Sequence, residues 1–131
     1  MLFINQSCGF LIYNYRGKLE CYYTIENINN DTTIRYNAGN LIFNLSQNTK
    51  LYERYKSKRM DSLYFYGPDY HTIEIKIEEK PKTTEIKLKY FGYNGSRKNP
   101  PQKTFINSIR DSLINRFGAT ESIKIQSSNE K

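Results

Sequence analysis

The sequence has few of the residues on which recognisable active sites depend. Its 131 residues include one histidine, His71, and two cysteines, with no tryptophan and no valine. A single histidine excludes a metal site built from several histidines, and a nucleophile–histidine–acid triad would have to combine His71 with an acid such as Asp69. We expect His71 to be an ordinary surface histidine. The sequence therefore predicts a protein that is not an enzyme and carries no metal or cofactor.

Long hydrophobic runs are absent from the sequence as well. No stretch approaches the roughly 18 apolar residues that indicate a transmembrane helix. The mean hydropathy of −0.76 is low, but the aromatic share of 15 % is higher than a disordered chain carries. We therefore expect one folded domain over residues 19–126, preceded by an N-terminal segment, 1–18, and followed by a polar tail, 127–131.

Alternation of apolar and polar residues predicts several strands. It is clearest over residues 19–26, whose apolar face consists of Leu19, Cys21, Tyr23 and Ile25. A second strand is predicted over residues 41–45, on Leu41, Phe43 and Leu45, after a break at residues 38–40. Residues 50–66 fit either a pair of strands or a long irregular loop.

Two alternating runs predict a β-hairpin over residues 72–91. With the turn centred between Lys80 and Pro81, Glu74 lies opposite Lys87 on the polar face. The same register sets three further pairs, which are Lys76 with Glu85, Ile73 with Leu88, and Ile75 with Ile86. Opposite charges and apolar residues agree on this register, and each cross-strand pair contributes about 0.2–1 kcal/mol.

A long helix is predicted after the hairpin. Asn99 suits its N-cap, Pro100 or Pro101 its first turn, and Gly118 the position just after its last turn. Helical spacing places five apolar residues on one stripe, which are Phe105, Ile106, Ile109, Leu113 and Phe117, and we expect this stripe to face the core. A short final strand follows over residues 122–126. The expected fold class is α+β, with a mostly antiparallel β-sheet and one long C-terminal helix followed by a short final strand.

The two cysteines, Cys8 and Cys21, do not meet in the simplest N-terminal arrangement. If residues 10–16 and 18–25 form a hairpin around Arg16 and Gly17, Cys8 falls near Ile25 and Cys21 near Ile12. A disulfide between them would need a different register. We expect Cys21 to be a small core residue.

The residues before Cys8 carry a resemblance to a known class of segment. An apolar stretch, Leu2–Ile4, is followed by Asn5, Gln6 and the small Ser7. This resembles the end of a bacterial lipoprotein signal peptide, in which an apolar stretch and a small residue lead to the cysteine that becomes lipidated. The resemblance implies that Cys8 carries a lipid and anchors the domain to a membrane surface. Asn5 departs from the pattern, which has leucine there, and the alternative is a first strand with a buried Cys8.

Basic residues are in excess and are concentrated in two segments. The net charge is +7, and residues 50–59 alone contain five basic residues, one acid and two tyrosines. Cations interleaved with aromatic rings are typical of proteins that bind polyanions. Three further cations lie near the start of the predicted helix. The candidate anion-binding residues are Lys50, Tyr52, Arg54, Tyr55, Lys56, Lys58, Arg59, Arg97, Lys98 and Lys103. The alternative is a solvated basic loop.

The loop over residues 92–98 joins a strand to a helix, as phosphate-binding loops do. The spacing of Gly92 and Gly95 matches neither the Walker nor the dinucleotide pattern, and Pro100 and Pro101 remove two backbone N–H donors. We therefore expect no nucleotide site there. A bound anion would still relieve the unfavourable placing of cations at a helix N-terminus.

Two functional hypotheses follow. The first is a small non-enzymatic binding or structural domain of the bacterial cell envelope, lipid-anchored through Cys8 in the periplasm or at the outer membrane. Its basic residues would face an anionic lipid or glycan surface, or a partner protein. The second is a soluble cytoplasmic basic module. It would bind nucleic acid, for which no motif is present, or a partner protein, as a toxin-neutralising protein does.

Overall fold

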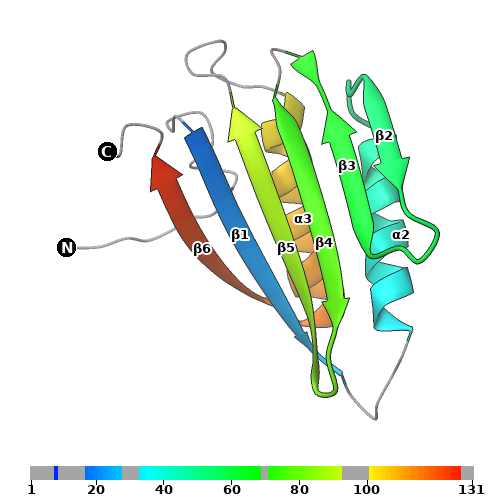
Figure 1. Cartoon of the computed structure of the whole chain (residues 1–131). Coiled ribbons are helices and arrows are strands. Elements are labelled where there is room, and N and C mark those ends of the chain that lie inside the picture. The colour runs from blue at the N-terminus through cyan, green and yellow to red at the C-terminus, as the bar shows by residue number, and fades with distance from the viewer. Residues whose placement is uncertain (1–7, 9–16, 28–32, 69–70, 93–100, 128–131) are drawn as a thin grey trace.

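The computed structural model describes residues 8, 17–27, 33–68, 71–92 and 101–127 of the chain. These residues form an antiparallel sheet with two helices packed on one of its faces (Figure 1). The strands are β1 (Gly17–Glu26), β2 (Glu53–Lys56), β3 (Ser62–Tyr66), β4 (Thr72–Glu79), β5 (Thr83–Gly92) and β6 (Thr120–Ser127). The helices are α2 (Ile34–Ser46) and α3 (Pro101–Phe117). The predicted α+β class, with a long C-terminal helix followed by a final strand, is confirmed.

The first strand lies inside the sheet rather than at its edge. The strand order is β2-β3-β4-β5-β1-β6, so β1 pairs with β5 on one side and β6 on the other. Both edges of β1 are therefore occupied by described strands, which leaves residues 18–25 no free edge for the hairpin considered above, and residues 10–16 lie outside the described residues. The predicted apolar face is right, because Leu19, Cys21, Tyr23 and Ile25 are all buried against the helix layer.

The predicted strand over residues 41–45 is wrong, because these residues belong to α2. The buried residues Ile34, Ala38 and Ile42 are four apart, which is the spacing of one helix face. The alternation of Leu41, Phe43 and Leu45 is too short to distinguish a strand from a helix.

Gly39, interpreted from the sequence as part of a chain break, lies within α2 and permits a close approach. A Cβ at this position would overlap the side chain of Met60, which comes from the β2–β3 turn and is buried. Met60 itself has a φ of 59°, a left-handed conformation that a non-glycine residue adopts at a cost. The turn is therefore packed directly onto the helix backbone.

The predicted hairpin exists as β4 and β5, but its register differs from the predicted one. Glu74 lies opposite Lys89 rather than Lys87, and Ile75 lies opposite Leu88. The Lys80 N–H donates to the Thr83 carbonyl at 2.8 Å, so the turn is centred after Pro81. Proline favours the first central position of such a turn and is disfavoured at the second, which explains the shift. The shift moves each pairing by two residues, so every side chain keeps its predicted face.

Residues 50–66, for which the sequence left two alternatives, form the strand pair β2–β3 rather than an irregular loop. At the other end of the chain, α3 and β6 lie where they are predicted. Gly118 follows α3 with a φ of 67°, and its N–H donates to the Ile114 carbonyl at 3.0 Å. Asn99 and Pro100 lie outside the described residues.

The core lies between the sheet and the helices. The predicted stripe of α3 is buried at Phe105, Ile106, Ile109 and Leu113, and Phe117 packs against it while partly exposed. The ring of Phe105 meets that of Phe65 in β3 edge-on, with centroids 4.9 Å apart. The opposite face of the sheet carries no helix in the part of the chain described (Figure 1), and we refer to it as the open face.

Candidate binding surface

The two cysteines form a disulfide. Cys8 and Cys21 are both fully buried, and their Cα atoms are 6.1 Å apart, within the usual range for this bond. The sequence left this pairing undecided, because the one N-terminal register considered does not bring the two cysteines together. Cys21 is the core residue that was predicted. A lipid thioether on Cys8 would use the same sulfur atom, so one molecule cannot carry both modifications.

Two predicted anion-binding residues, Arg54 and Lys56, have contacts within the fold. They lie opposite Phe65 and Leu63 in β3, so they extend from the helix-facing side of β2. Arg54 donates from Nε to the Ser46 carbonyl at 3.1 Å, beside the C-terminus of α2 where a cation is favourable. The Nζ atom of Lys56 lies 4.7 Å from the ring centroid of Phe43.

Both cations also protect an exposed strand edge. In the part of the chain described, β2 lies at one end of the strand order, and all four of its residues are exposed. Charged side chains on an edge strand oppose pairing with another molecule. The contacts and the position of Arg54 and Lys56 therefore explain part of the basic segment without a ligand.

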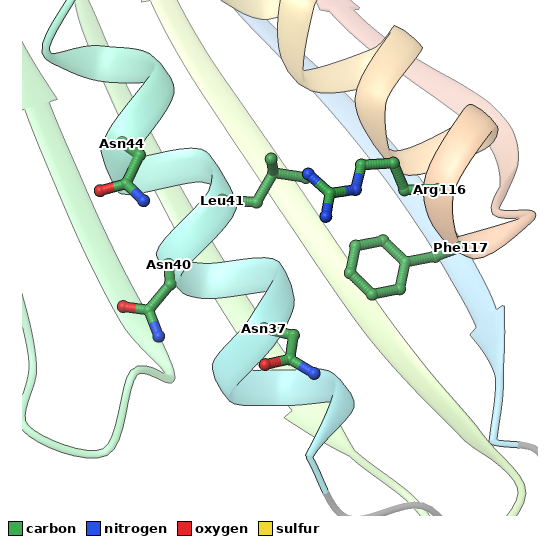
Figure 2. Close-up of a pocket in the computed structure, with 6 residues that line it drawn as sticks. All are labelled: Asn37, Asn40, Leu41, Asn44, Arg116 and Phe117. Atoms are coloured by element: carbon green, nitrogen blue, oxygen red, sulfur yellow. The ribbon is translucent and has the colours of Figure 1, made fainter.

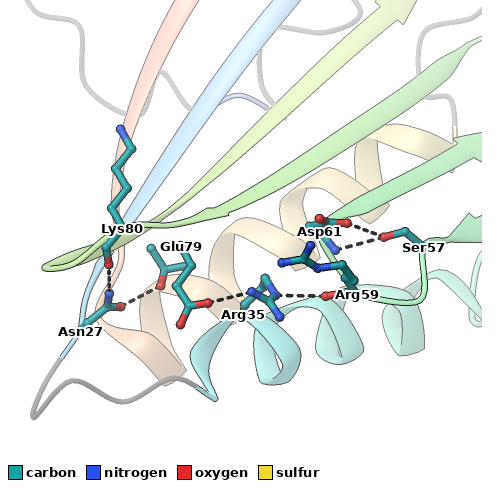
Figure 3. Close-up of polar contacts among 8 residues, drawn as sticks. Asn27, Arg35, Ser57, Arg59, Asp61, Glu79 and Lys80 are labelled. Carbon is teal, nitrogen blue, oxygen red and sulfur yellow. Dashed lines mark hydrogen bonds and ion pairs between the residues drawn. The ribbon is translucent and has the colours of Figure 1, made fainter.

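The β2–β3 turn presents Lys58 and Arg59, whose side chains are exposed. Its backbone is held from outside, because the Arg59 carbonyl accepts a hydrogen bond of 3.0 Å from Nε of Arg35 in α2 (Figure 3). Arg35 also pairs with Glu79 in β4 at 2.7 Å. These contacts tie the turn to a helix and to a second strand.

A hydroxyl–carboxylate contact closes the same turn from within. Ser57 donates from Oγ to the carboxylate of Asp61 at 2.7 Å, and its Oγ accepts from the Asp61 N–H at 3.1 Å. The hydrogen bond from Ser57 holds the pKa of Asp61 below its usual value. These hydrogen bonds hold the turn in one conformation without a ligand.

The tyrosines of the basic segment belong to a larger group on the open face. Tyr55 lies opposite Tyr64 in β3, and the rings of Tyr52 and Tyr66 have centroids 5.9 Å apart. Tyr52 is 65 % exposed and Tyr55 is 57 % exposed. We refer to Tyr52, Tyr55, Tyr64 and Tyr66 as the tyrosine cluster.

Sequence reasoning selected Tyr52 and Tyr55 but missed Tyr64 and Tyr66 as members of one surface. The signal was present, because Tyr64 and Tyr66 alternate with the buried Leu63 and Phe65. That alternation assigns the two tyrosines to the polar face of a strand.

Charges of both signs surround the tyrosine cluster. One row of opposed residues crosses the open face from β2 to β6, and its members are Tyr55, Tyr64, Glu74, Lys89, Glu20 and Lys124. The pKa of Tyr64 is raised, first by burial and then by Glu53 and Glu74. The potential beside the cluster is therefore not uniformly positive, which disfavours a polyanion as its ligand.

The remaining candidate residues do not form one patch with the β2–β3 turn. Leu51 and Gln102 both approach Gly67, where a Cβ would come within 3.0 Å of Leu51 Cδ2 and would overlap the Gln102 amide. Lys50 precedes Leu51 by one position and Lys103 follows Gln102 by one position, so both lysines belong to the same end of the sheet. Lys58 and Arg59 lie beyond the other end of β2 (Figure 1). Arg97, Lys98 and Asp69 lie outside the described residues.

His71 is not a surface histidine, contrary to the prediction. It is 4 % exposed, and its Nδ1 is hydrogen-bonded to the hydroxyl of Tyr90 in β5. Its carbonyl accepts a hydrogen bond of 3.1 Å from Nε2 of the buried Gln102. His71 has the same parity as Ile73, so the alternation of β4 already indicated a core-facing position. These contacts give His71 a structural role in joining β4, β5 and α3.

A groove between the two helices was not predicted. It measures about 320 Å³ and is lined by Asn37, Asn40, Leu41, Asn44, Arg116 and Phe117. Figure 2 shows Arg116 and Phe117 reaching from α3 towards α2, with Leu41 pointing towards Arg116. The three asparagines are spaced as neighbours on one helix face. The sequence could not place that face beside Arg116, because the two helices are more than 50 residues apart.

Two further features are absent from the described residues. These residues contain no group of three side chains suited to hold a metal ion. None of their helices is long and apolar enough to cross a membrane. The chain matches no model of a known protein family, and no curated protein is similar enough to count as a relative.

Proposed function

We propose that the chain is a small non-enzymatic binding domain of the bacterial cell envelope, and that it docks a partner protein through the tyrosine cluster. The observation that carries the location is the Cys8–Cys21 disulfide. Structural disulfides form and persist in oxidising compartments such as the periplasm and are rare in the cytosol. The bond also ties Cys8 to the strand with neighbours on both sides, which suits a domain that must persist outside the cytosol.

The tyrosine cluster supports a protein partner. Tyrosine is enriched at the centres of protein interfaces, because its ring supplies a large contact area and its hydroxyl a hydrogen bond. Tyr52 and Tyr55 are exposed and lie beside Tyr64 and Tyr66 on the open face, over which the described residues place no helix. The alternating charges on the neighbouring strands suit a partner with charges of both signs, and they would fix its orientation.

The location is tested by trapping the thiols of the protein in its own host. Cells are quenched with acid and alkylated without reduction, and the intact protein is weighed. The proposal requires no alkylation and a mass two hydrogens below that of the reduced chain. Alkylation of both cysteines would contradict it. An added diacylglyceryl mass on Cys8 would mean that this cysteine carries the lipid anchor and not the disulfide.

The partner is tested by cross-linking in intact envelopes. A protein adduct of a single defined mass is expected with the natural chain, and Tyr55→Ala should remove it. The matched control is Tyr36→Ala, because Tyr36 is 42 % exposed but lies on α2. Equal adducts in both variants would contradict docking at the cluster. Tight binding of single-stranded nucleic acid that weakens steeply with salt would favour a polyanion instead.

A further inference from the structure

We infer that the groove between α2 and α3 binds an acidic sugar, which is a pyranose ring that carries a carboxylate. The groove lies on the helix layer, away from the open face that carries the tyrosine cluster (Figures 1 and 2). This inference is independent of the proposed function, because the two surfaces can be occupied at the same time.

The polar side chains of the groove are available to a ligand. In the part of the chain that the structure describes, Asn40, Asn44 and Arg116 form no side-chain hydrogen bond or ion pair. Asn37 makes one weak contact, from Nδ2 to the Thr33 hydroxyl at 3.3 Å. These side chains can therefore turn to a ligand without breaking strong contacts within the fold.

The charge of the groove is positive because its walls contain no acid. The sequence of α2 has no aspartate or glutamate, and Asp111, the acid of α3, already pairs with Arg110 at 3.0 Å. Arg116 lies in the last turn of α3, and the helix dipole favours a cation near the C-terminus of a helix. Figure 2 shows that its guanidinium extends across the groove towards α2, where a bound anion can reach it.

Each kind of side chain in the lining suits one part of a sugar acid. A carboxamide both donates and accepts hydrogen bonds, as a sugar hydroxyl does. A guanidinium offers paired donors that fit a carboxylate in bidentate geometry. Phe117 and Leu41 supply an apolar wall for the C–H face of a pyranose ring. A single arginine favours one carboxylate over a polyphosphate, which would need several cations.

The size of the groove limits the ligand. Small-molecule sites measure about 300–1,000 Å³, and at about 320 Å³ the groove is at the lower end. It therefore suits one ring. That ring can be a free sugar acid or one unit of an acidic polysaccharide, since both present the same carboxylate and hydroxyls.

The test is a titration of the purified chain with methyl β-glucuronide, followed by backbone amide shifts, with methyl β-glucoside as the neutral probe. Saturable shifts at Asn40, Asn44 and Arg116 are expected with the glucuronide, and at least tenfold weaker binding with the glucoside. Equal binding of both sugars, or no saturable shift at the groove, would overturn the inference. An oligoglucuronide titrated in parallel distinguishes a free sugar acid from a unit of an acidic polysaccharide. A polysaccharide site should bind the oligomer more tightly per ring than it binds the single sugar.

Variants assign the binding to the groove. Arg116→Gln should weaken the glucuronide at least tenfold and leave the glucoside unchanged. Lys76→Gln is the matched control, because it removes one positive charge from an exposed side chain on the open face of β4. Asn40→Leu should weaken both sugars. An equal effect of Arg116→Gln and Lys76→Gln would show a general charge effect and overturn the assignment.

Discussion

The hydroxyl of Tyr23 in β1 donates a hydrogen bond of 2.8 Å to a carboxylate oxygen of Glu121, which lies directly opposite it in β6. The other carboxylate oxygen accepts from Nε of Arg110 in α3 at 2.9 Å. Tyr23 is fully buried, and Glu121 is nearly so. The contact joins the interior strand β1, the final strand and the long helix at one point.

Stability at alkaline pH should depend on Tyr23. Burial first, and then the charge of Glu121, raise the pKa of its hydroxyl far above the usual value. A raised pKa in the folded state means that this stabilisation is full below the pKa in the unfolded chain, about 10, and is lost as the pH rises above it. The difference in unfolding free energy between the natural chain and Tyr23→Phe should therefore shrink between about pH 9 and pH 12. Urea titrations across this range measure it, and a constant difference would contradict the assignment.

At neutral pH, Tyr23→Phe should reduce the unfolding free energy by about 2 kcal/mol, since a hydrogen bond to a charged group contributes about 1.5–3 kcal/mol. The loss should be much smaller when Glu121 is already glutamine. A double-mutant cycle of Tyr23→Phe and Glu121→Gln, measured by chemical denaturation, tests this coupling. Additive losses would mean that the two residues act separately.

Reduction of the disulfide should lower the unfolding free energy by about 3 kcal/mol, because closing a loop of this size restricts the unfolded chain. The cysteines are 13 positions apart in the sequence. Denaturation with and without a phosphine reductant measures the loss. The reductant should leave a Cys8→Ser/Cys21→Ser variant unchanged, and an equal loss in that variant would show an effect unrelated to the bond.

Gly39→Ala should destabilise the protein although alanine is the better helix former by about 1 kcal/mol. The reason is the overlap of the new Cβ with the side chain of Met60. Met60→Gly removes that side chain and also relieves the left-handed φ. In the Met60→Gly background, Gly39→Ala should therefore become neutral or stabilising. If Gly39→Ala still lowers the stability in the Met60→Gly background, as measured by thermal unfolding, then the destabilisation does not come from overlap with the Met60 side chain.

The sequence predicted the elements whose pattern is long and complete. β1 and α3 each repeat their period over several residues, so their faces follow from it. The hairpin of β4 and β5 was placed on the correct faces, but its register depended on which turn position Pro81 occupies. In α2, the short alternation of Leu41, Phe43 and Leu45 was interpreted as a strand. Gly39 was interpreted as a break, because its contact with Met60 cannot be seen in the local sequence.

The functional surfaces were less predictable, because they depend on distant residues. The basic residues of 50–59 were identified, but the use of Arg54 at the end of α2 needed the position of that helix. The groove needed the placement of α2 beside the last turn of α3. Composition gives the chemical types that are present, whereas their grouping is a property of the fold.

The strand order has a consequence for how the molecule is made. β1 is translated before all the other described strands, yet its two neighbours, β5 and β6, are translated last. The sheet therefore cannot be completed before β6 is translated, and its formation depends on slow contacts between distant parts of the chain. A sheet that stays incomplete until β6 is made also leaves time for a secretion channel to thread the unfolded strands.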